Sequence, residues 1–101
     1  MMKYYSIICT DTPNSLHKRQ SLRESHLSRL TELKHHNRLL LAGPYFAKDS
    51  DNYIQGEVIG SIIIAQFSNL QEAKEWAAAD PFVTAGVYAN VIVRTFKPVN
   101  L

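Results

Sequence analysis

The chain has 101 residues, of which 46% are hydrophobic and 20% are charged, and its formal net charge is +2. This length and composition are typical of one compact domain over residues 1–101, and they exclude intrinsic disorder and fibrous repeats. The small positive charge does not by itself indicate a nucleic-acid or membrane partner.

The first predicted elements are a strand and a long helix. Segment 4–10 is short, aromatic and β-branched, which predicts a strand. Leucines recur at helical spacing across 16–36, after Asn14 or Ser15 as a candidate N-cap. Asn37 is a suitable left-handed residue beyond the end of this helix.

Two further strands are predicted, with a loop between them. Segment 38–42 predicts a strand that ends at Gly43-Pro44, and the polar segment 45–57 predicts a loop. Segment 58–67 is the strongest strand candidate in the chain, because it is rich in β-branched residues.

A second helix and a last strand complete the chain. Asn69 is a candidate N-cap with Glu72 three residues later, which is the spacing of a capping box. We expect this helix to run to Asp80, where Pro81 ends it, and a final strand to cover 90–96.

The order strand-helix-strand-strand-helix-strand predicts an α+β fold, the ferredoxin-like sandwich with two helices on one face of a four-stranded antiparallel sheet. Alternate residues of 58–67 point to opposite faces, yet both sets are apolar, with Ile62 and Ile64 on one face and Ile63 and Phe67 on the other. A helix-free face in contact with water would be polar. We therefore expect a second copy of the chain to cover it, giving a homodimer joined sheet to sheet.

The most informative feature is a conflict on the first helix. At about 100° per residue its leucines span an arc of roughly 140°, and His26, Arg19 and Arg23 fall inside that arc. Burying unpaired charge is costly, so one interpretation is a polar pocket whose cations face an anionic ligand. The alternative is that the arginine stems pack while their charged ends reach water, and that His26 is an ordinary core histidine.

Asp80 is the candidate partner of His26. Continuing the second helix at the same spacing places Asp80 on its inward side, although a carboxylate at a helix C-terminus opposes the helix dipole. If the two side chains meet, the carboxylate fixes the tautomer of the imidazole for acid–base chemistry. The alternative is a helix-ending Asp-Pro turn in which Asp80 binds nearby backbone groups.

Three more residues are candidates for the wall of this pocket. Ser61 either presents its hydroxyl to the pocket or marks a place where another element packs closely. Gly43 and Pro44 either form only a turn or border the pocket where a glycine lets a ligand approach the backbone.

Other chemistries are not indicated. The single cysteine, Cys9, excludes an internal disulfide and a cysteine-built zinc site, and we expect it to be a buried thiol in a reducing, cytoplasmic setting. The histidines lack the spacing of a helical metal site, so we predict no metal and no cofactor. Residues 61–66 carry none of the aromatic side chains on which RNA-recognition domains stack bases. No apolar run approaches the roughly 20 residues that cross a bilayer, and 1–11 lacks a signal-peptide cleavage site, so we expect neither a nucleic-acid nor a membrane partner.

Taken together, these residues resemble the YciI-like family over essentially the whole chain. Each motif is weak alone, but their order and spacing are specific: Arg23-x-x-His26-Leu27, Arg38-Leu39-Leu40 leading to Ala42-Gly43-Pro44, Gly60-Ser61, Ala73-x-x-Trp76-x-x-x-Asp80-Pro81 and Ala85-Gly86-Val87-Tyr88. The loop over 47–57 differs most from the family pattern, because it is less rich in glycine and proline.

The resemblance implies a dimeric α+β barrel of ferredoxin-like subunits and an active site built on His26 and Asp80. It also implies that Ser61 and Arg23 belong to this site. The family is similar in fold to muconolactone isomerase and includes a dehydrochlorinase of a chlorinated hydroxyquinol. Both of these enzymes move protons on small oxygenated rings.

Several functions therefore remain open. The first is a cofactor-independent lyase or isomerase acting on a small anionic compound, aromatic or lactone-like, in which His26 moves a proton, Asp80 orients it, and Arg23 with Arg19 holds the anion. The alternative is a non-catalytic, small-anion-binding or regulatory dimer that uses the same pocket. A third is a histidine nucleophile that accepts a phosphoryl group at His26.

Overall fold

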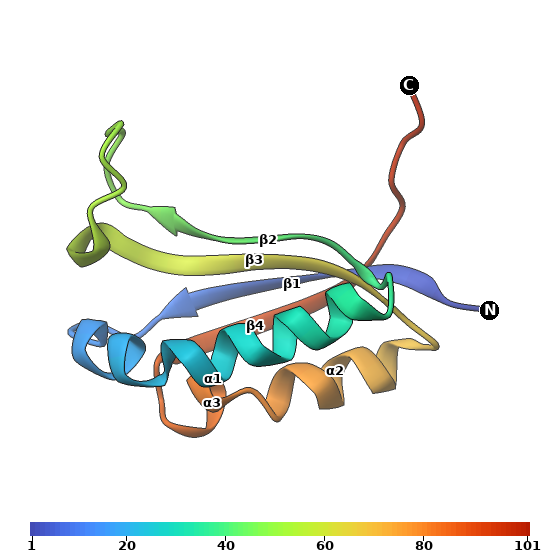
Figure 1. Ribbon diagram of the computed structural model, residues 1–101, viewed down its shortest axis with the longest axis horizontal. Coiled ribbons are helices and arrows are strands. Elements are labelled where there is room, and N and C mark those ends of the chain that lie inside the picture. The colour runs from blue at the N-terminus through green and yellow to red at the C-terminus, as the bar shows by residue number, and fades with distance from the viewer.

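The computed structural model describes residues 1–101, apart from the side chain of Gln55. The elements in chain order are β1 (Lys3–Asp11), α1 (Leu16–His35), β2 (Leu39–Phe46), η1 (Gln55–Glu57), β3 (Val58–Phe67), α2 (Leu70–Ala78), α3 (Pro81–Thr84) and β4 (Tyr88–Phe96). The strands form a four-stranded antiparallel sheet in the order β2-β3-β1-β4, and the helices lie along one face of it (Figure 1). The predicted α+β, ferredoxin-like arrangement is confirmed.

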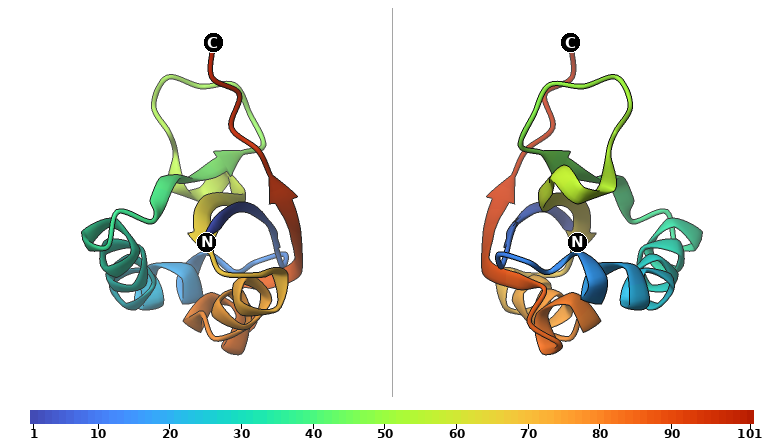
Figure 2. Two further views of the ribbon diagram at one scale, coloured as in Figure 1. Left: turned by 90° about the vertical axis from the view of Figure 1, so that its right-hand side faces the viewer. Right: turned by 90° about the vertical axis from the view of Figure 1, so that its left-hand side faces the viewer.

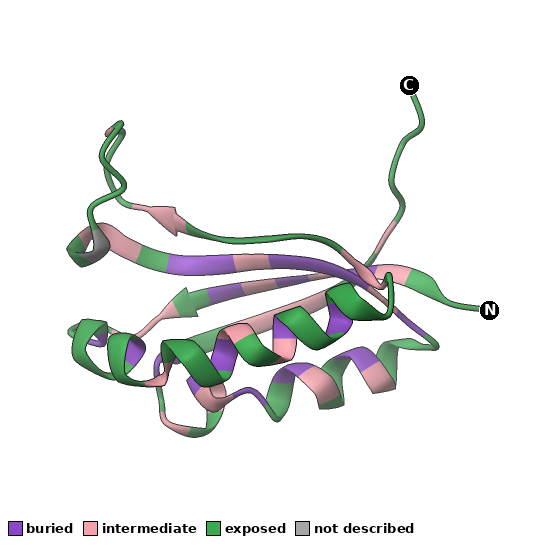
Figure 3. Cartoon of the chain, in the orientation of Figure 1, coloured by how far each residue is buried: buried purple, intermediate pink, exposed green. Residues whose placement is uncertain are grey.

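The core lies between the helices and one face of the sheet. On β1 the buried residues alternate, so that Tyr5, Ile7 and Cys9 share a face, and Ile63 and Ala65 are their buried partners on β3. Figure 3 shows this as buried stretches along β1 and β3, above the helices. The helices contribute leucines from α1 and alanines from α2: Leu30, Leu33, Ala73 and Ala77. Burial of these side chains positions the inward-facing residues of α1 against the sheet.

Local sequence signals explain where α2 begins and where α1 ends, whereas Ser15, the N-cap of α1, makes no capping hydrogen bond with its side chain. The Asn69 side chain caps α2 by accepting a 2.8 Å hydrogen bond from the backbone N–H of Glu72. Asn37, just beyond α1, has a positive φ of 57°, as the sequence predicted. None of the helices in the described part of the chain is both long and apolar enough to cross a membrane.

The second strand is longer than predicted. The sequence predicts that it ends at Gly43-Pro44, but β2 continues through both residues to Phe46, with Pro44 opposite Ser61 of β3. That prediction was wrong because β2 is an edge strand of the sheet. A proline lacks only a hydrogen-bond donor, and an edge strand has one side on which that donor is not needed.

The second helix is shorter than predicted and is followed by another. The sequence predicts a helix that runs to Asp80, whereas α2 ends at Ala78 and α3 begins at Pro81. Asp80 is the N-cap of α3, with an extended backbone (φ −66°, ψ 136°) and a side chain that accepts a 2.9 Å hydrogen bond from the N–H of Phe82. The residue before a proline disfavours helical geometry, and proline suits the first position of a helix, so one dipeptide ends α2 and starts α3.

The other face of the sheet has no helix over it. Ile62 pairs with Ile8, and Ile8 pairs with Ile92, which gives a partly exposed isoleucine row across three strands. On β2, Leu41 is 48% exposed beside Ile64. Figure 2 shows that the β2–β3 loop and the C-terminal segment both rise on this side, away from the helices. The centre of this face is apolar and uncovered within one chain.

Candidate functional site

A cavity of about 240 Å³ lies between α1 and the β2–β3 side of the sheet. Its apolar lining comes from Leu27, Leu30 and Ile63, and its polar lining comes mainly from α1 and β3. The residues around it that the sequence analysis singled out are Arg19, Arg23, His26, Gly43, Pro44 and Ser61. Asp80 lies directly behind His26. The structure thus gathers all the candidate residues into one place.

His26 and Asp80 form a buried contact. The imidazole Nδ1 lies 2.9 and 3.0 Å from the two carboxylate oxygens of Asp80, and the residues are 6% and 2% exposed. An ionised carboxylate can only accept, so Nδ1 carries the hydrogen. The second ring nitrogen, Nε2, is then the one available to the cavity that His26 lines.

Three donors converge on Asp80. Besides His26, the N–H of Phe82 lies 2.9 Å away and Nη1 of Arg29 lies 3.1 Å away. Burial would raise the pKa of Asp80, but the hydrogen bond and charge of His26, with the Phe82 N–H and Arg29, outweigh it. The pKa of Asp80 therefore lies below its ordinary value, and the carboxylate stays ionised.

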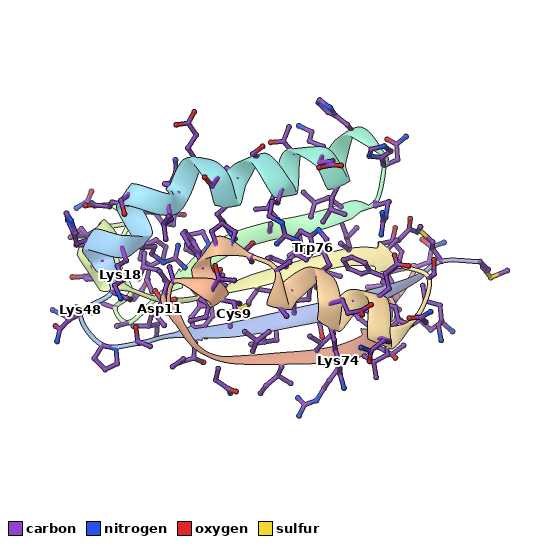
Figure 4. All side chains as sticks on the ribbon, turned by 90° about the horizontal axis from the view of Figure 1, so that it is seen from below. Cys9, Asp11, Lys18, Lys48, Lys74 and Trp76 are labelled. Atoms are coloured by element: carbon purple, nitrogen blue, oxygen red, sulfur yellow. The ribbon has the colours of Figure 1, made fainter. Side chains whose placement is uncertain are left out.

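The side chain of Arg29 reaches from α1 to α2. Its Nη2 donates a 2.7 Å hydrogen bond to the carbonyl oxygen of Trp76, and its guanidinium lies 4.2 Å from the centre of the Trp76 ring. Figure 4, seen from the helix side, shows Trp76 between the two helices. Arg29 thereby supplies Asp80 with a permanent positive charge, and its position is fixed by packing.

Aromatic rings fix the orientation of the imidazole. The His26 ring stacks on Phe82 at 4.2 Å between centroids and an interplanar angle of 11°. Tyr88 meets the same imidazole edge-on, at 6.4 Å and 85°. With Nδ1 bound to Asp80 and one ring face covered, rotation of His26 would cost both contacts.

Arg19 is a structural part of the site rather than a free cation. Its Nε donates to Asp11 at 2.9 Å, and its Nη2 donates to the hydroxyl of Ser61 and, at 3.3 Å, to the carbonyl oxygen of Gly60. The residue is only 8% exposed. Arg19 therefore holds Ser61 in place while Asp11 balances its charge.

Arg23 differs from Arg19, although both arginines line the cavity. It is exposed to solvent, and it forms no ion pair with any side chain among the described residues. Its guanidinium is thus free to meet an anion that enters the cavity.

Gly43 and Pro44 form part of the cavity wall on β2. A Cβ atom added at Gly43 would meet nothing within 4 Å in this chain. The wall at this position is therefore open backbone, which a ligand can approach.

Four residues of the site were not singled out from the sequence: Asp11, Arg29, Phe82 and Tyr88. Arg29 carried a usable signal, because it follows His26 by one helical turn and therefore lies on a neighbouring part of α1. Asp11 and Tyr88 meet the site only because β1 and β4 pair in the sheet, which no local pattern reveals.

Neither a reactive thiol nor a metal-binding cluster accompanies this pair among the described residues. Cys9 is buried, and burial raises the pKa of its thiol to about 12, which keeps it protonated and unreactive. Among the described residues there is no group of three or more His, Cys, Asp or Glu side chains placed to hold a metal ion.

Known proteins are similar to this chain in sequence, and one of them also in its solved structure. An uncharacterized protein of Haemophilus influenzae is 56% identical over 96 residues, which are 95% of this chain and 98% of the relative. Protein YciI of Escherichia coli is 47% identical over 95 residues, covering 94% and 97%. The solved structure of 5-chloro-2-hydroxyhydroquinone dehydrochlorinase from Burkholderia phenoliruptrix, in complex with 2,5-dihydroxybenzoquinone, is 28% identical and superposes with a TM-score of 0.83 over 93% of each chain.

A family model described as the YCII-related domain matches residues 2–97. This match covers nearly the whole chain, including every residue of the site, and it agrees with the resemblance inferred from the motifs. The chain belongs to the YCII-related domain family.

Proposed function

We propose that this protein is a small enzyme that moves a proton on a one-ring, oxygenated anion, as a lyase or isomerase does. The observation that carries the proposal is the buried contact between His26 Nδ1 and Asp80 at the wall of a ligand-sized cavity. A histidine held in one tautomer by a carboxylate is the usual arrangement of a general acid–base catalyst.

In this mechanism His26 accepts a proton from the bound compound at Nε2. Asp80 keeps the proton on Nδ1 and stabilises the imidazolium cation that forms, while Arg29 keeps Asp80 ionised. In an isomerisation, His26 then returns the proton to another atom of the ligand. In an elimination, the leaving group departs as an anion such as chloride, and His26 passes the proton to water. The proposal requires no metal and no cofactor.

The cavity supports a single-ring substrate. An engineered protein cavity of about 150 Å³ binds benzene, so about 240 Å³ accommodates one ring with oxygen substituents. Leu27, Leu30 and Ile63 provide apolar contacts for the ring, and Arg23 and Ser61 provide donors for anionic oxygens. The dehydrochlorinase that this chain resembles acts on a compound of this kind.

We further propose that two copies associate through the helix-free face of the sheet. The partly exposed row of Ile62, Ile8 and Ile92, with the exposed Leu41, would lose contact with water on association. Light scattering at micromolar concentration measures the mass directly, and a monomer mass would contradict this assembly.

A second candidate is a binding protein that consumes nothing. It is favoured by Arg23, an exposed arginine at the cavity that can capture an anion without any chemistry. In this case the same cavity binds the anion, and the contact between His26 and Asp80 serves only binding.

One experiment separates these functions. The protein is titrated with 2,5-dihydroxybenzoquinone and incubated with 5-chloro-2-hydroxyhydroquinone while chloride release is measured, using the wild type, His26→Gln and His17→Gln. His17 is an exposed histidine on the same helix and serves as the control. Catalysis predicts chloride release that falls at least ~100-fold in His26→Gln and stays unchanged in His17→Gln. Binding without chloride release supports the second candidate. If the protein shows no binding and no chloride release, the proposed substrate class is wrong.

A further inference from the structure

The hydroxyl group of Tyr88 is buried without a hydrogen-bond partner among the described residues. Tyr88 begins β4, is 7% exposed, and packs its ring edge-on to both Phe82 and His26. A buried hydroxyl that loses its hydrogen bonds to water without replacement destabilises the fold. Such an exception calls for a specific explanation.

Ser61 and Cys9 are the groups beside this hydroxyl. They face each other across the β1–β3 ladder. Arg19, which donates to Ser61, also lies with its guanidinium 5.9 Å from the centre of the Tyr88 ring. Burial raises the pKa of Tyr88, although Ser61 beside it opposes the rise. The phenol therefore keeps its proton and can act as a donor.

The hydrogen-bonding capacity of Ser61 decides what it offers to the cavity. A serine hydroxyl has two acceptor positions and one proton to donate. Arg19 already occupies one acceptor position through Nη2. If Tyr88 occupies the second, the only capacity left is the proton, and Ser61 can present it to the cavity that it lines.

We propose that Tyr88 donates a hydrogen bond to Ser61 and so positions the Ser61 hydroxyl as a donor toward an anionic oxygen in the cavity. Tyr88 is then a positioning residue, since it acts through Ser61 and does not line the cavity itself. This inference rests on the proposed function for the class of ligand.

The consequence is selectivity for an acceptor. An enolate, phenolate or carboxylate oxygen fits a site whose serine can only donate, whereas a ligand that presents an N–H group there leaves two donors facing each other. Such a ligand is rejected because neither proton finds an acceptor.

A double-mutant cycle with 2,5-dihydroxybenzoquinone as the probe tests the coupling. Tyr88→Phe removes only the hydroxyl, and we expect it to weaken binding by about three- to tenfold in the wild-type background. In the Ser61→Ala background the same substitution should change the affinity less than about twofold, because the residue through which Tyr88 acts is gone. An equal loss in both backgrounds, or no loss in either, overturns the proposal.

Tyr45→Phe is the matched control. Its hydroxyl donates a 2.7 Å hydrogen bond to the carbonyl oxygen of Cys9, away from the cavity lining. We expect its affinity for the probe to equal that of the wild type. A loss as large as that of Tyr88→Phe would show that removing any tyrosine hydroxyl near β1 suffices, which would overturn a specific role for Tyr88.

A second cycle needs no ligand. Urea unfolding of the wild type, Tyr88→Phe, Ser61→Ala and the double variant should give a coupling of about two- to tenfold in the unfolding equilibrium constant. Additive effects overturn the hydrogen bond even if the probe binds. If the wild type does not bind the probe, the proposed substrate class fails, and this second cycle still decides whether Tyr88 and Ser61 are paired.

Discussion

The inner half of the site and its mouth differ in how their charges are balanced. In the inner half the charges are paired within the chain. Oδ2 of Asp80 lies 3.1 Å from Nη1 of Arg29, and Oδ2 of Asp11 lies 2.9 Å from Nε of Arg19. At the mouth, Arg23 is exposed and has no ion pair with another side chain among the described residues.

This difference separates two tasks. Buried charges must be paired, so the inner groups are held in fixed positions before any ligand arrives, as a catalytic site requires. An exposed arginine costs the fold little, and its charge is left for a partner that is not part of the chain. In the proposed function, the inner half provides the chemistry, and the mouth captures the anion.

Asp80→Asn tests the inner half at its centre. The amide keeps the shape of the side chain but removes the negative charge, and it replaces one acceptor oxygen by an NH2 donor. The side chain then no longer holds the hydrogen of His26 on Nδ1, so the imidazole tautomer is no longer fixed. We expect chloride release from 5-chloro-2-hydroxyhydroquinone to fall at least ~100-fold, and the slowly exchanging Nδ1–H signal of His26 to disappear from the proton NMR spectrum. Asp49→Asn, in the exposed loop, is the control. An unchanged rate after loss of the NMR signal would show that the contact does not serve catalysis.

Replacing Arg19 or Arg23 by methionine compares the two halves directly. Arg19→Met leaves Asp11 without its partner in a mostly buried position, which costs about 3–5 kcal/mol of unfolding free energy. Arg23→Met should change the unfolding free energy by less than about 0.5 kcal/mol, because the side chain is exposed. Urea unfolding measures both values, and equal costs would show that the Arg19–Asp11 pair has no special importance.

The sequence predicted the order of elements because strand and helix periodicity is local. The prediction failed where the length of an element depends on its position in the whole sheet. Pro44 can be part of β2 only because that strand lies at an edge of the sheet. The position of a strand in the sheet cannot be predicted from the residues of that strand alone. The local sequence at Asp80 and Pro81 predicts only the end of one helix, although the same dipeptide also begins the next.

The site was predictable to the extent that it contradicted the core pattern. His26 and Arg19 stood out because polar residues occupied an apolar arc, and Asp80 because a helix C-terminus does not favour a carboxylate. Arg29 was overlooked because it lies just outside that arc, and its role depends on where α2 places Trp76 and Asp80. Contacts between distant elements have no local signature.

At the mouth, Arg23→Met should weaken anion binding without affecting the fold. One charge-assisted hydrogen bond at an accessible site is worth roughly tenfold in affinity for 2,5-dihydroxybenzoquinone. Because the contact is exposed, raising the salt concentration should reduce the difference between variant and wild type. Lys18→Met, which removes an exposed cation outside the cavity lining, is the control. Equal affinities of Arg23→Met and wild type at low salt would remove Arg23 from the binding site.

The last expected difference between the inner half and the mouth is in how the unfolding free energy changes at acidic pH. Burial opposes ionisation of Asp80, but the hydrogen bond and charge of His26 outweigh it, so the pKa of Asp80 is lower in the folded chain than in the unfolded chain. The stability that ionised Asp80 contributes is therefore complete above the unfolded pKa and is lost as the pH falls through the folded one. Between about pH 6 and about pH 3, the unfolding free energy of the wild type should fall more than that of Asp80→Asn, whereas Arg23→Met should follow the wild type. Parallel losses in all three proteins would assign the acid sensitivity to other carboxylates and show that the balanced inner half contributes no more to stability in acid than the mouth does.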